Sequence, residues 1–338
     1  AAAAAKVLAG QPPPDQVDID LPEGGQASLA IRSCGGSPTC ARASVVKDAG
    51  DDPDITDGVT VEVTLRTMPE GDLIFVAGPG VGRVTKPGLS LKPGEPAINP
   101  VPRRMIASAI RKTIRQPVEV TVSIPGGEAL AARTFNPRLG IQGGLSILGT
   151  TGVVRPFSLK SVQETIRCSL SVASASGVTA VVLVPGNLGR RAAHRLFHLA
   201  EEQVVEISNE WGFSLDAAKA HPFTAILALG HPGKLAKLAA GDWDTHSARS
   251  RSAVPAVRSF LPDDLASAAP DAETVEALCE RLPRDRARAV GDRVAKAVRQ
   301  AIRDRHAGIA VAVVLTNLAG DLTGRAGDFT PWKEHTSP

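Results

Sequence analysis

The residues best suited to bind a cofactor stand in three short polar segments of the C-terminal half. Each segment follows an apolar run that predicts a buried strand, and together they contain Gly186, Asn187 and Gly189; Glu206, Ser208 and Asn209; and Gly230, His231, Gly233 and Lys234. Glycine lets the backbone approach a ligand closely, a carboxylate after a strand can bind ribose hydroxyls, and a helix N-terminus favours an anion. A turn needs glycine for its geometry alone, but three such turns at one edge of a sheet predict an adenosine-type cofactor.

These turns lack the spacing of the common nucleotide motifs. Neither a GxGxxG fingerprint nor a GxxxxGK[ST] phosphate loop is present, so hydride transfer and ATP hydrolysis lose support. His231 and His246 are fifteen residues apart with no obvious third ligand, so we expect no metal site. His246, which has polar neighbours, is the better candidate for acid–base chemistry.

A second group of candidates lies in the N-terminal half, within segments rich in glycine and proline. Lys47 and Asp48 begin an acidic turn, and residues 78–104 hold charged and amide side chains, namely Lys86, Glu95, Asn99, Arg103 and Arg104. A loop this long is usually functional or disordered, and its interleaved Val, Leu and Ile argue against disorder. Lysine and arginine bind carboxylates, arginine through two parallel hydrogen bonds. We therefore predict that this segment binds a carboxylate-rich ligand, whereas a plain solvated turn is the alternative for the acidic residues.

The elements that would position these residues differ between the two halves. Alternating segments such as Val59–Arg66 predict half-buried strands, and a helix should begin at Pro100 with Asn99 as its cap. In the second half, helices alternate with four apolar runs, 178–184, 204–208, 223–229 and 309–315, which predicts a small parallel sheet. We expect an α+β domain over residues 1–155, an α/β domain over 156–330 and a tail at 331–338.

Composition narrows the classes of protein. The chain of 338 residues carries a net charge of +3 and has no tyrosine, so neither a basic stripe nor stacking platforms for nucleic acid are expected. No apolar run approaches the roughly 18 residues that span a bilayer, and the N-terminus lacks the basic region of a signal peptide. The four cysteines have no zinc-site spacing. These features favour a cytoplasmic protein with reduced thiols.

Six blocks, in order along nearly the whole chain, resemble the cobalt-precorrin-5B C-1 methyltransferase family of cobalamin biosynthesis. They are SVVKDAGDDPD (44–54), GVGRVTKPGL (80–89), GEPAINPVPRRMI (94–106), TFNPRLGIQGGLSILGTTG (134–152), VVEISNEWGFSLDAA (204–218) and GHPGKLAKLAAGDWDTHS (230–247). The resemblance implies an S5 domain-2-like α+β domain and a small α/β domain with a four-stranded parallel sheet. It also implies S-adenosylmethionine as methyl donor and a tetrapyrrole with acetate and propionate groups as acceptor.

The family reaction gives cobalt-precorrin-6A and includes loss of a two-carbon fragment, which a nearby acid or base would assist. Candidates for that role are Asp48, Glu95 and His246. We expect the donor at the three C-terminal turns and the macrocycle at Lys47, Lys86, Asn99, Arg103 and Arg104.

Two departures from the family pattern leave an alternative open. Family members usually open with a TTGTCA-like block before an alanine-rich helix, and this sequence begins at the alanines. After residue 247 they usually continue with an Ala-Asp-Ala-Arg-like stretch, whereas this chain has Ala-Arg-Ser-Arg at 248–251. The alternative is a non-catalytic tetrapyrrole-binding module. A third interpretation, a kinase-like nucleotide-binding protein, would need a better phosphate loop than residues 78–82.

Overall fold

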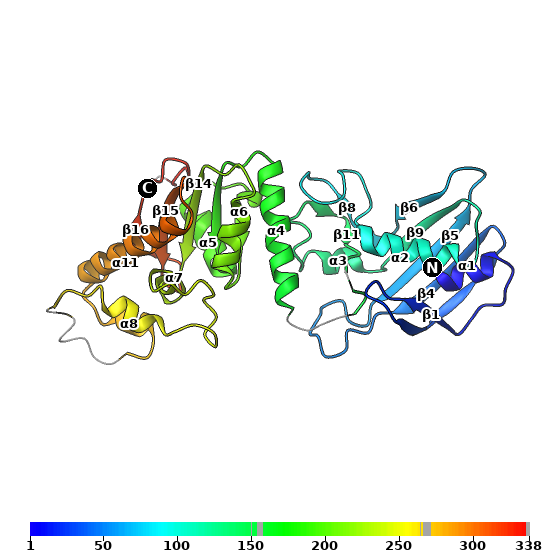
Figure 1. Cartoon of the computed structure of the whole chain (residues 1–338), viewed down its shortest axis with the longest axis horizontal. Helices are drawn as coiled ribbons and strands as arrows, with labels where there is room; N and C mark the ends of the chain where they lie inside the picture. Colours follow the sequence, from blue (N-terminus) through cyan, green and yellow to red (C-terminus); the bar gives the residue numbers. More distant parts are fainter. Residues whose placement is uncertain (150, 154–157, 264, 266–271, 336–338) are drawn as a thin grey trace. The chain divides into compact units, whose positions relative to one another are not determined.

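The computed structural model describes residues 1–149, 151–153, 158–263, 265 and 272–335 (Figure 1). The chain divides into two compact units, residues 1–158 and 159–338. Both units combine helices with sheets, so the protein belongs to the mixed α and β class.

A five-stranded sheet forms the centre of unit 1. Its order is β3 (Ser33–Ser37), β4 (Cys40–Val46), β5 (Thr60–Thr67), β9 (Val118–Ser123) and β6 (Leu73–Ala77). Neighbouring strands are antiparallel except β6 and β9, which are parallel and are joined through α2 (Pro100–Arg111). The alternation in β5 buries Val63 and Leu65, as a strand with one core face requires. Helix α1 (Ala2–Leu8) packs against β3, β4 and β5, and a hairpin of β1 (Gln16–Asp20) and β2 (Gln26–Ala30) completes this part.

The glycine-rich segment of unit 1 forms short strand pairs with a second segment about sixty residues later in the chain. Strand β7 (Gly80–Val81) pairs in parallel with β11 (Gly144–Leu145), and β8 (Arg83–Val84) pairs antiparallel with β10 (Ile141–Gln142). Helix α3 (Gly127–Ala131) lies beside β11. Gly80 has a φ of +77°, and a Cβ there would overlap the carbonyl oxygen of Ile124. The close crossing of backbones therefore requires glycine at position 80.

Unit 2 is built on a five-stranded sheet. Its order is β13 (Val204–Glu206), β12 (Ala180–Val184), β14 (Ala225–Gly230), β15 (Ala310–Thr316) and β16 (Leu322–Ala326). The first four strands are parallel and correspond to the four expected apolar runs, whereas β16 is antiparallel to β15. The expected total of four strands is therefore wrong by one. Residues 322–326, LTGRA, are mostly only partly buried and contain glycine and arginine. This edge strand therefore has no apolar run from which the sequence could predict it.

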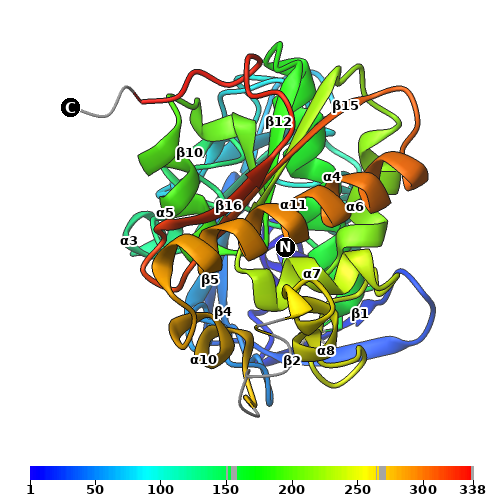
Figure 2. The same cartoon turned by 90° about the vertical axis from the view of Figure 1, so that its left-hand side faces the viewer.

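Helices cover both faces of this sheet. Helices α4 (Leu159–Ala175), α6 (Trp211–Ala218), α7 (Pro232–Ala239) and α11 (Arg284–Arg305) contribute to one hydrophobic core, and Figure 2 shows α11 running along β16. Helix α5 (Asn187–Leu196) packs with Phe329 and Trp332 in the core on the other face. Two short helices, α8 (Ala253–Arg258) and α10 (Val275–Glu280), also pack near α7. Helix α11 begins directly after Pro283, whose ring fits a helix start but not a helix interior.

Residues 331–335, expected as a tail, pack along unit 2. The Trp332 side chain is 2% exposed, and its Nε1 donates to the carbonyl of Ala180 at 3.2 Å. Glu334 forms a β-bridge with Phe197.

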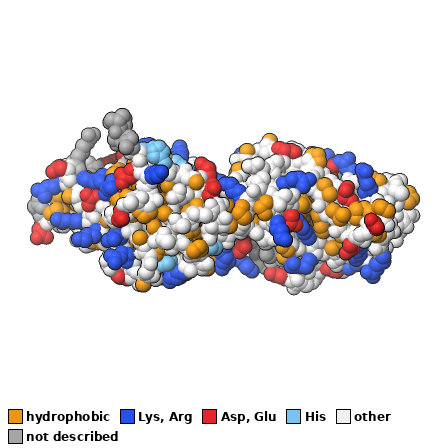
Figure 3. All heavy atoms as spheres, turned by 90° about the horizontal axis from the view of Figure 1, so that it is seen from above, with side chains coloured by type: hydrophobic (Ala, Val, Ile, Leu, Met, Phe, Trp, Pro, Cys, Tyr) orange, Lys and Arg blue, Asp and Glu red, His pale blue; other side chains and the backbone are white. Residues whose placement is uncertain are grey.

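Charged side chains of both signs are mixed over the face that Figure 3 shows, without a continuous basic stripe on that face. Within the described part of the chain, no helix combines the length and the apolar character needed to cross a membrane.

Candidate functional site

Three turns meet at one edge of the unit 2 sheet. Strand β12 lies between β13 and β14, and all three are parallel, so their carboxyl ends share this edge. Parallel sheets commonly bind ligands at that edge. The structure therefore brings together all the residues expected to bind the cofactor: Gly186, Asn187 and Gly189 after β12, Glu206, Ser208 and Asn209 after β13, and Gly230, His231, Gly233 and Lys234 after β14. We call this edge the donor edge.

The turn after β12 contains glycines with two different functions. A Cβ at Gly189 would lie 3.0 Å from the Cβ of Val184 and 3.4 Å from the carbonyl oxygen of Leu229. Gly189 therefore allows α5 to pack closely on the strands. At Gly186, in contrast, a Cβ would meet no atom within 4 Å, and the next residue, Asn187, is exposed. A ligand can approach the backbone at Gly186.

The turn after β13 is held in an uncommon conformation. Glu206 pairs in register with Val184, and Ser208 then adopts a φ of +54°, the left-handed region. This backbone costs a non-glycine residue about 1–2 kcal/mol, and it ends β13 at Glu206 rather than at Ser208 as expected. Asn209 follows, and its carbonyl and side-chain oxygens accept hydrogen bonds from the backbone and hydroxyl of Thr245, at 3.1 and 3.2 Å.

The turn after β14 uses its histidine to begin a helix. His231 Nδ1 accepts a hydrogen bond from the backbone of Gly233 at 3.0 Å, which caps α7. Because Nδ1 accepts, Nε2 carries the proton, and it donates to Glu276 at 2.6 Å. The side chain of His231 is thus engaged within the protein. Lys234 is half-buried, and burial together with the nearby charge of Lys237 lowers its pKa.

A segment after α7 joins the donor edge, which the sequence did not reveal. Asp244 forms a β-bridge with Glu210, and Trp243 accepts a hydrogen bond from the backbone of Gly212 at 3.0 Å. These contacts bring His246 beside the β13 turn. His246 Nδ1 accepts from the backbone of Ala248 at 3.2 Å, and its Nε2 has no hydrogen bond to any residue that the structure describes.

Asp244 is fixed as a carboxylate in the same segment. It accepts from Arg249 Nε at 2.5 Å and from the backbone of His246 at 2.9 Å. Burial alone would raise the pKa of Asp244, but these hydrogen bonds and the positive charge of Arg249 together lower it. Asp244 therefore stays ionised at neutral pH.

In unit 1, Arg103 and Glu95 bind each other and their own loop. The guanidinium of Arg103 donates to the carbonyl oxygens of Ile98 and Pro96, at 2.7 and 3.1 Å, and to Glu95 at 2.9 Å. Glu95 also accepts from the backbone of Lys92 at 2.6 Å. That backbone hydrogen bond, followed by Arg103, lowers the pKa of Glu95 against the opposing effect of burial. The hydrogen bonds of both side chains therefore stabilise their own loop, and Glu95 is ionised.

The other expected ring-binding residues of this segment are arranged differently. Arg104 is exposed and makes no hydrogen bond or ion pair with a described residue. Asn99 precedes α2 as expected, but its side chain makes no capping hydrogen bond, and its backbone donates to Ile147 at 2.9 Å. The carbon chain of Lys86 lies against Gly140.

The acidic turn closes on itself. Lys47 Nζ donates to Asp54 and, at 2.5 Å, to Thr56, while the exposed Asp48 accepts from the backbone of Gly50 at 2.8 Å. Burial alone would raise the pKa of Asp54, but the hydrogen bonds from Lys47 and Thr56 together lower it. These contacts within the turn agree with the alternative of a plain solvated turn.

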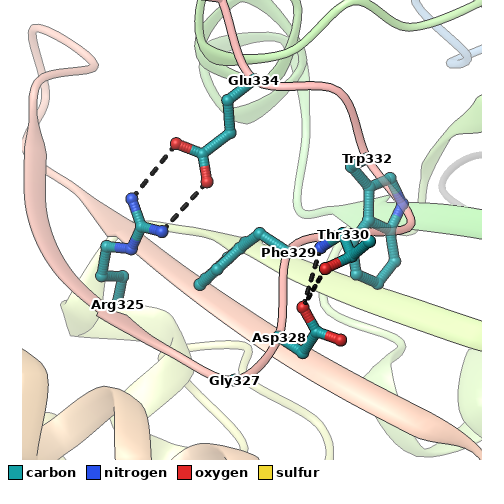
Figure 4. Close-up of a pocket in the computed structure, with 7 residues that line it drawn as sticks. All are labelled: Arg325, Gly327, Asp328, Phe329, Thr330, Trp332 and Glu334. Carbon is teal, nitrogen blue, oxygen red and sulfur yellow. Dashed lines mark hydrogen bonds and ion pairs between the residues drawn. The ribbon is translucent and has the colours of Figure 1, made fainter.

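A pocket of about 470 Å³ lies at the opposite edge of the unit 2 sheet (Figure 4). It is lined by Arg325, Gly327, Asp328, Phe329, Thr330, Trp332 and Glu334. Trp332 reaches the first residue of β12, and Gly327 lies against Val311 near the start of β15, so this is the amino end of the parallel strands. Arg325 binds Glu334 through two hydrogen bonds of 3.2 and 3.0 Å. Asp328 accepts hydrogen bonds from the backbone and hydroxyl of Thr330, at 2.9 and 2.6 Å. None of the expected site residues lines this pocket, and its charged groups bind within it, so we place the candidate site at the donor edge.

The described residues include no group of three or more His, Cys, Asp or Glu side chains arranged to hold a metal ion.

Known proteins match this chain over both units. The family model described as CbiD matches residues 1–156, and that described as CbiD, C-terminal domain, matches residues 244–327. A cobalt-precorrin-5B C(1)-methyltransferase from Syntrophotalea carbinolica is 50% identical over 338 residues, 98% of this chain and 96% of the relative. A relative of the same name from Methanocaldococcus jannaschii is 41% identical over 304 residues, 87% of this chain and 83% of the relative.

A crystal structure of a cobalamin biosynthesis protein (cbiD) from Archaeoglobus fulgidus is 27% identical, with a TM-score of 0.37 over 72% of this chain and 76% of that one. The family models and the two relatives together show that this chain belongs to the CbiD family.

Proposed function

We propose that this chain transfers a methyl group from S-adenosylmethionine to C-1 of cobalt-precorrin-5B, giving cobalt-precorrin-6A in cobalamin biosynthesis. The observation that carries this proposal is the 50% identity, over 98% of the chain, to a relative named for that reaction. An α/β unit with three polar, glycine-containing turns at one sheet edge supports an adenosyl donor there.

The residues at the donor edge fit S-adenosylmethionine. Open space at Gly186 would let the adenosine part lie against the backbone, and Glu206 would accept hydrogen bonds from ribose hydroxyls. The N-terminus of α7 and Lys234 would attract the carboxylate of the donor. When bound, the donor would supply a methyl group attached to a positively charged sulfur. The methyl group would form its new bond to C-1 of the ring, and the electron pair of the broken carbon–sulfur bond would stay on sulfur.

The main contribution of the protein to such a transfer is geometric. Holding two reactants in contact and in line can lower a barrier by about 7–11 kcal/mol, and no metal or strong nucleophile is needed. The turns of the donor edge would fix the methyl group, and the loops of residues 1–155 would fix the ring. We propose Lys47, Lys86, Asn99, Arg103 and Arg104 for that second role, of which the exposed Arg104 is the best placed to meet a carboxylate.

An acid or base would assist the loss of the two-carbon fragment. His246 is our first choice because its Nδ1 is fixed as an acceptor, so Nε2 carries a proton and has no described partner. Asp48 and Glu95 remain weaker candidates, since both accept hydrogen bonds from their own turns. We further propose an S5 domain-2-like fold for unit 1, supported by the parallel pair β6 and β9 joined through α2. We place the reaction in the cytoplasm, in keeping with four free cysteines.

The direct test is to incubate the protein with cobalt-precorrin-5B and methyl-labelled S-adenosylmethionine and to weigh the product. We expect a ring that has gained one labelled methyl group and lost the two-carbon fragment. A non-catalytic tetrapyrrole-binding module would retain the ring on the protein but incorporate no label, and that result would overturn the proposal.

A further inference from the structure

Lys237 is a buried lysine that forms no ion pair with a carboxylate of the described residues. Lys237 is 7% exposed, and its Nζ donates to the carbonyl oxygen of Thr245 at 3.2 Å and to the hydroxyl of Ser250 at 2.8 Å. No described Asp or Glu forms an ion pair with it, although the negative charge of nearby Asp242 attracts it. Burial of an ammonium without an ion-pair partner is costly unless hydrogen bonds compensate it. The ammonium is thus held mainly by the two neutral oxygens that it binds.

Both oxygens belong to the turn that carries His246. The hydroxyl of Ser250 accepts from Lys237 and in turn donates to the carbonyl oxygen of His246 at 2.7 Å. The backbones of Arg249 and Ser250 donate to the same carbonyl, each at 3.0 Å. Lys237 therefore holds this turn, residues 245–250, at both ends, through Thr245 and through Ser250.

The turn has a second anchor on the donor edge. Thr245 binds Asn209 through its backbone and its hydroxyl, so the β13 turn and α7 hold the same residue from two sides. Asn209 follows β13, and Lys237 lies on the helix that follows β14. With both anchors in place, His246 has a fixed position relative to the donor edge.

We propose that Lys237 is a positioning residue for methyl transfer, whose ammonium fixes the turn 245–250 and thereby the orientation of His246. The inference rests on the proposed function only for its effect on turnover. Its structural part, the fixed turn, stands on the contacts of Lys237, Ser250 and Thr245 alone. Lys237 is not assigned any contact with donor or ring.

The test compares the wild-type protein with Lys237→Met, which keeps an unbranched side chain, one atom shorter, but removes its hydrogen-bond donors. Ser250→Ala removes one acceptor of the ammonium from a half-buried position, and it provides a milder variant if Lys237→Met does not fold. Lys296→Met is the matched control, because Lys296 is exposed on α11 and makes no described contact. Amide hydrogen exchange in peptides spanning residues 243–251 reports on the turn without requiring activity.

We expect faster exchange at 245–250 in Lys237→Met and, to a lesser degree, in Ser250→Ala, with peptides from β12 unchanged. Turnover should fall about 10- to 100-fold in Lys237→Met, the factor expected for loss of a charged hydrogen bond, with little change in KM for the donor. Because the lysine acts through His246, adding Lys237→Met to His246→Gln should cost little more than His246→Gln alone.

Three outcomes would overturn the proposal: unchanged exchange in the turn of Lys237→Met, unchanged turnover in an active protein, or fully additive losses in the double variant. Failure of the proposed function would look different. The wild-type protein would then transfer no methyl group, while exchange in the turn would still separate Lys237→Met from Lys296→Met.

Discussion

The donor edge of unit 2 and the segment of residues 78–104 in unit 1 are both rich in glycine and polar residues, yet these residues have different roles in the two regions. In the loop, Arg103 and Glu95 satisfy each other and nearby backbone groups, and Gly80 is required by a backbone crossing. At the donor edge, Gly186 faces open space and His246 keeps a ring nitrogen without a described partner. Substitutions of Gly80, Glu95 or Arg103 should therefore reduce stability, whereas substitutions at the donor edge should reduce ligand affinity.

The largest effect is expected at Gly80. Gly80→Ala forces a Cβ onto the carbonyl oxygen of Ile124 at a φ of +77°, and we expect unfolding to become easier by about 2–6 kcal/mol. Gly126→Ala is the matched control, since Gly126 has a φ of +79° but no atom within 4 Å, and only the backbone cost of about 1–2 kcal/mol applies. Urea unfolding followed by circular dichroism measures both, and equal losses would contradict the tight crossing.

The second effect concerns affinity. Glu206→Ala should weaken binding of S-adenosylmethionine about 10- to 100-fold, because a charged hydrogen-bond acceptor for the ribose is lost. Titration calorimetry measures this, with Glu273→Ala as control because Glu273 is exposed and makes no described contact. Unchanged affinity in Glu206→Ala would contradict the proposed binding of S-adenosylmethionine at this edge.

Arg103 and Arg104 are neighbours on α2, and we expect one to affect stability and the other to affect ring binding. Arg103→Gln should destabilise the protein by about 1–3 kcal/mol, because the loop loses charged hydrogen bonds. Arg104→Gln should leave stability unchanged and weaken binding of the ring about two- to fivefold, as for an exposed charge pair. Thermal unfolding and fluorescence-quenching titrations with the ring compare them. A larger loss of ring affinity in Arg103→Gln than in Arg104→Gln, without loss of stability, would contradict this division of roles.

The smallest effect is a pH dependence in the acidic turn. The pKa of Asp54 is lowered from its ordinary value of 3.8, so the folded protein favours its carboxylate. The stability that this adds is present above that value and is lost as the pH falls through the folded pKa. Asp54→Asn should therefore be less stable than wild type at pH 7, by less than about 1 kcal/mol, and the difference should shrink in acid. Urea unfolding of both proteins at pH 7 and in acid measures the difference in stability. A difference that grew in acid would contradict the lowered pKa of Asp54.

The sequence predicted the elements whose burial is regular. Alternation identified β5, and continuous apolar runs identified the four parallel strands of unit 2. The strands β7, β8, β10 and β11 were missed because two residues each give no periodic signal. Strand β16 was missed because its residues are mixed in polarity.

The candidate site was predictable only in part, for a related reason. The order of strands and helices along the chain places three polar turns at one edge. Contacts between distant segments, such as Asn209 with Thr245, have no local signature. Composition also could not show that Arg103 binds backbone carbonyl groups of its own loop, or that Lys237 is buried.

The central claim is methyl transfer to one carbon of the ring, and its most direct test is the position of the new methyl group. The protein, cobalt-precorrin-5B and S-adenosylmethionine with a ¹³C-methyl group are combined, and the product is examined by carbon NMR. We predict one enriched methyl signal, whose protons correlate with C-1 of the ring in a long-range proton–carbon spectrum. Enrichment at another carbon, or a bound ring without enrichment, would contradict the account.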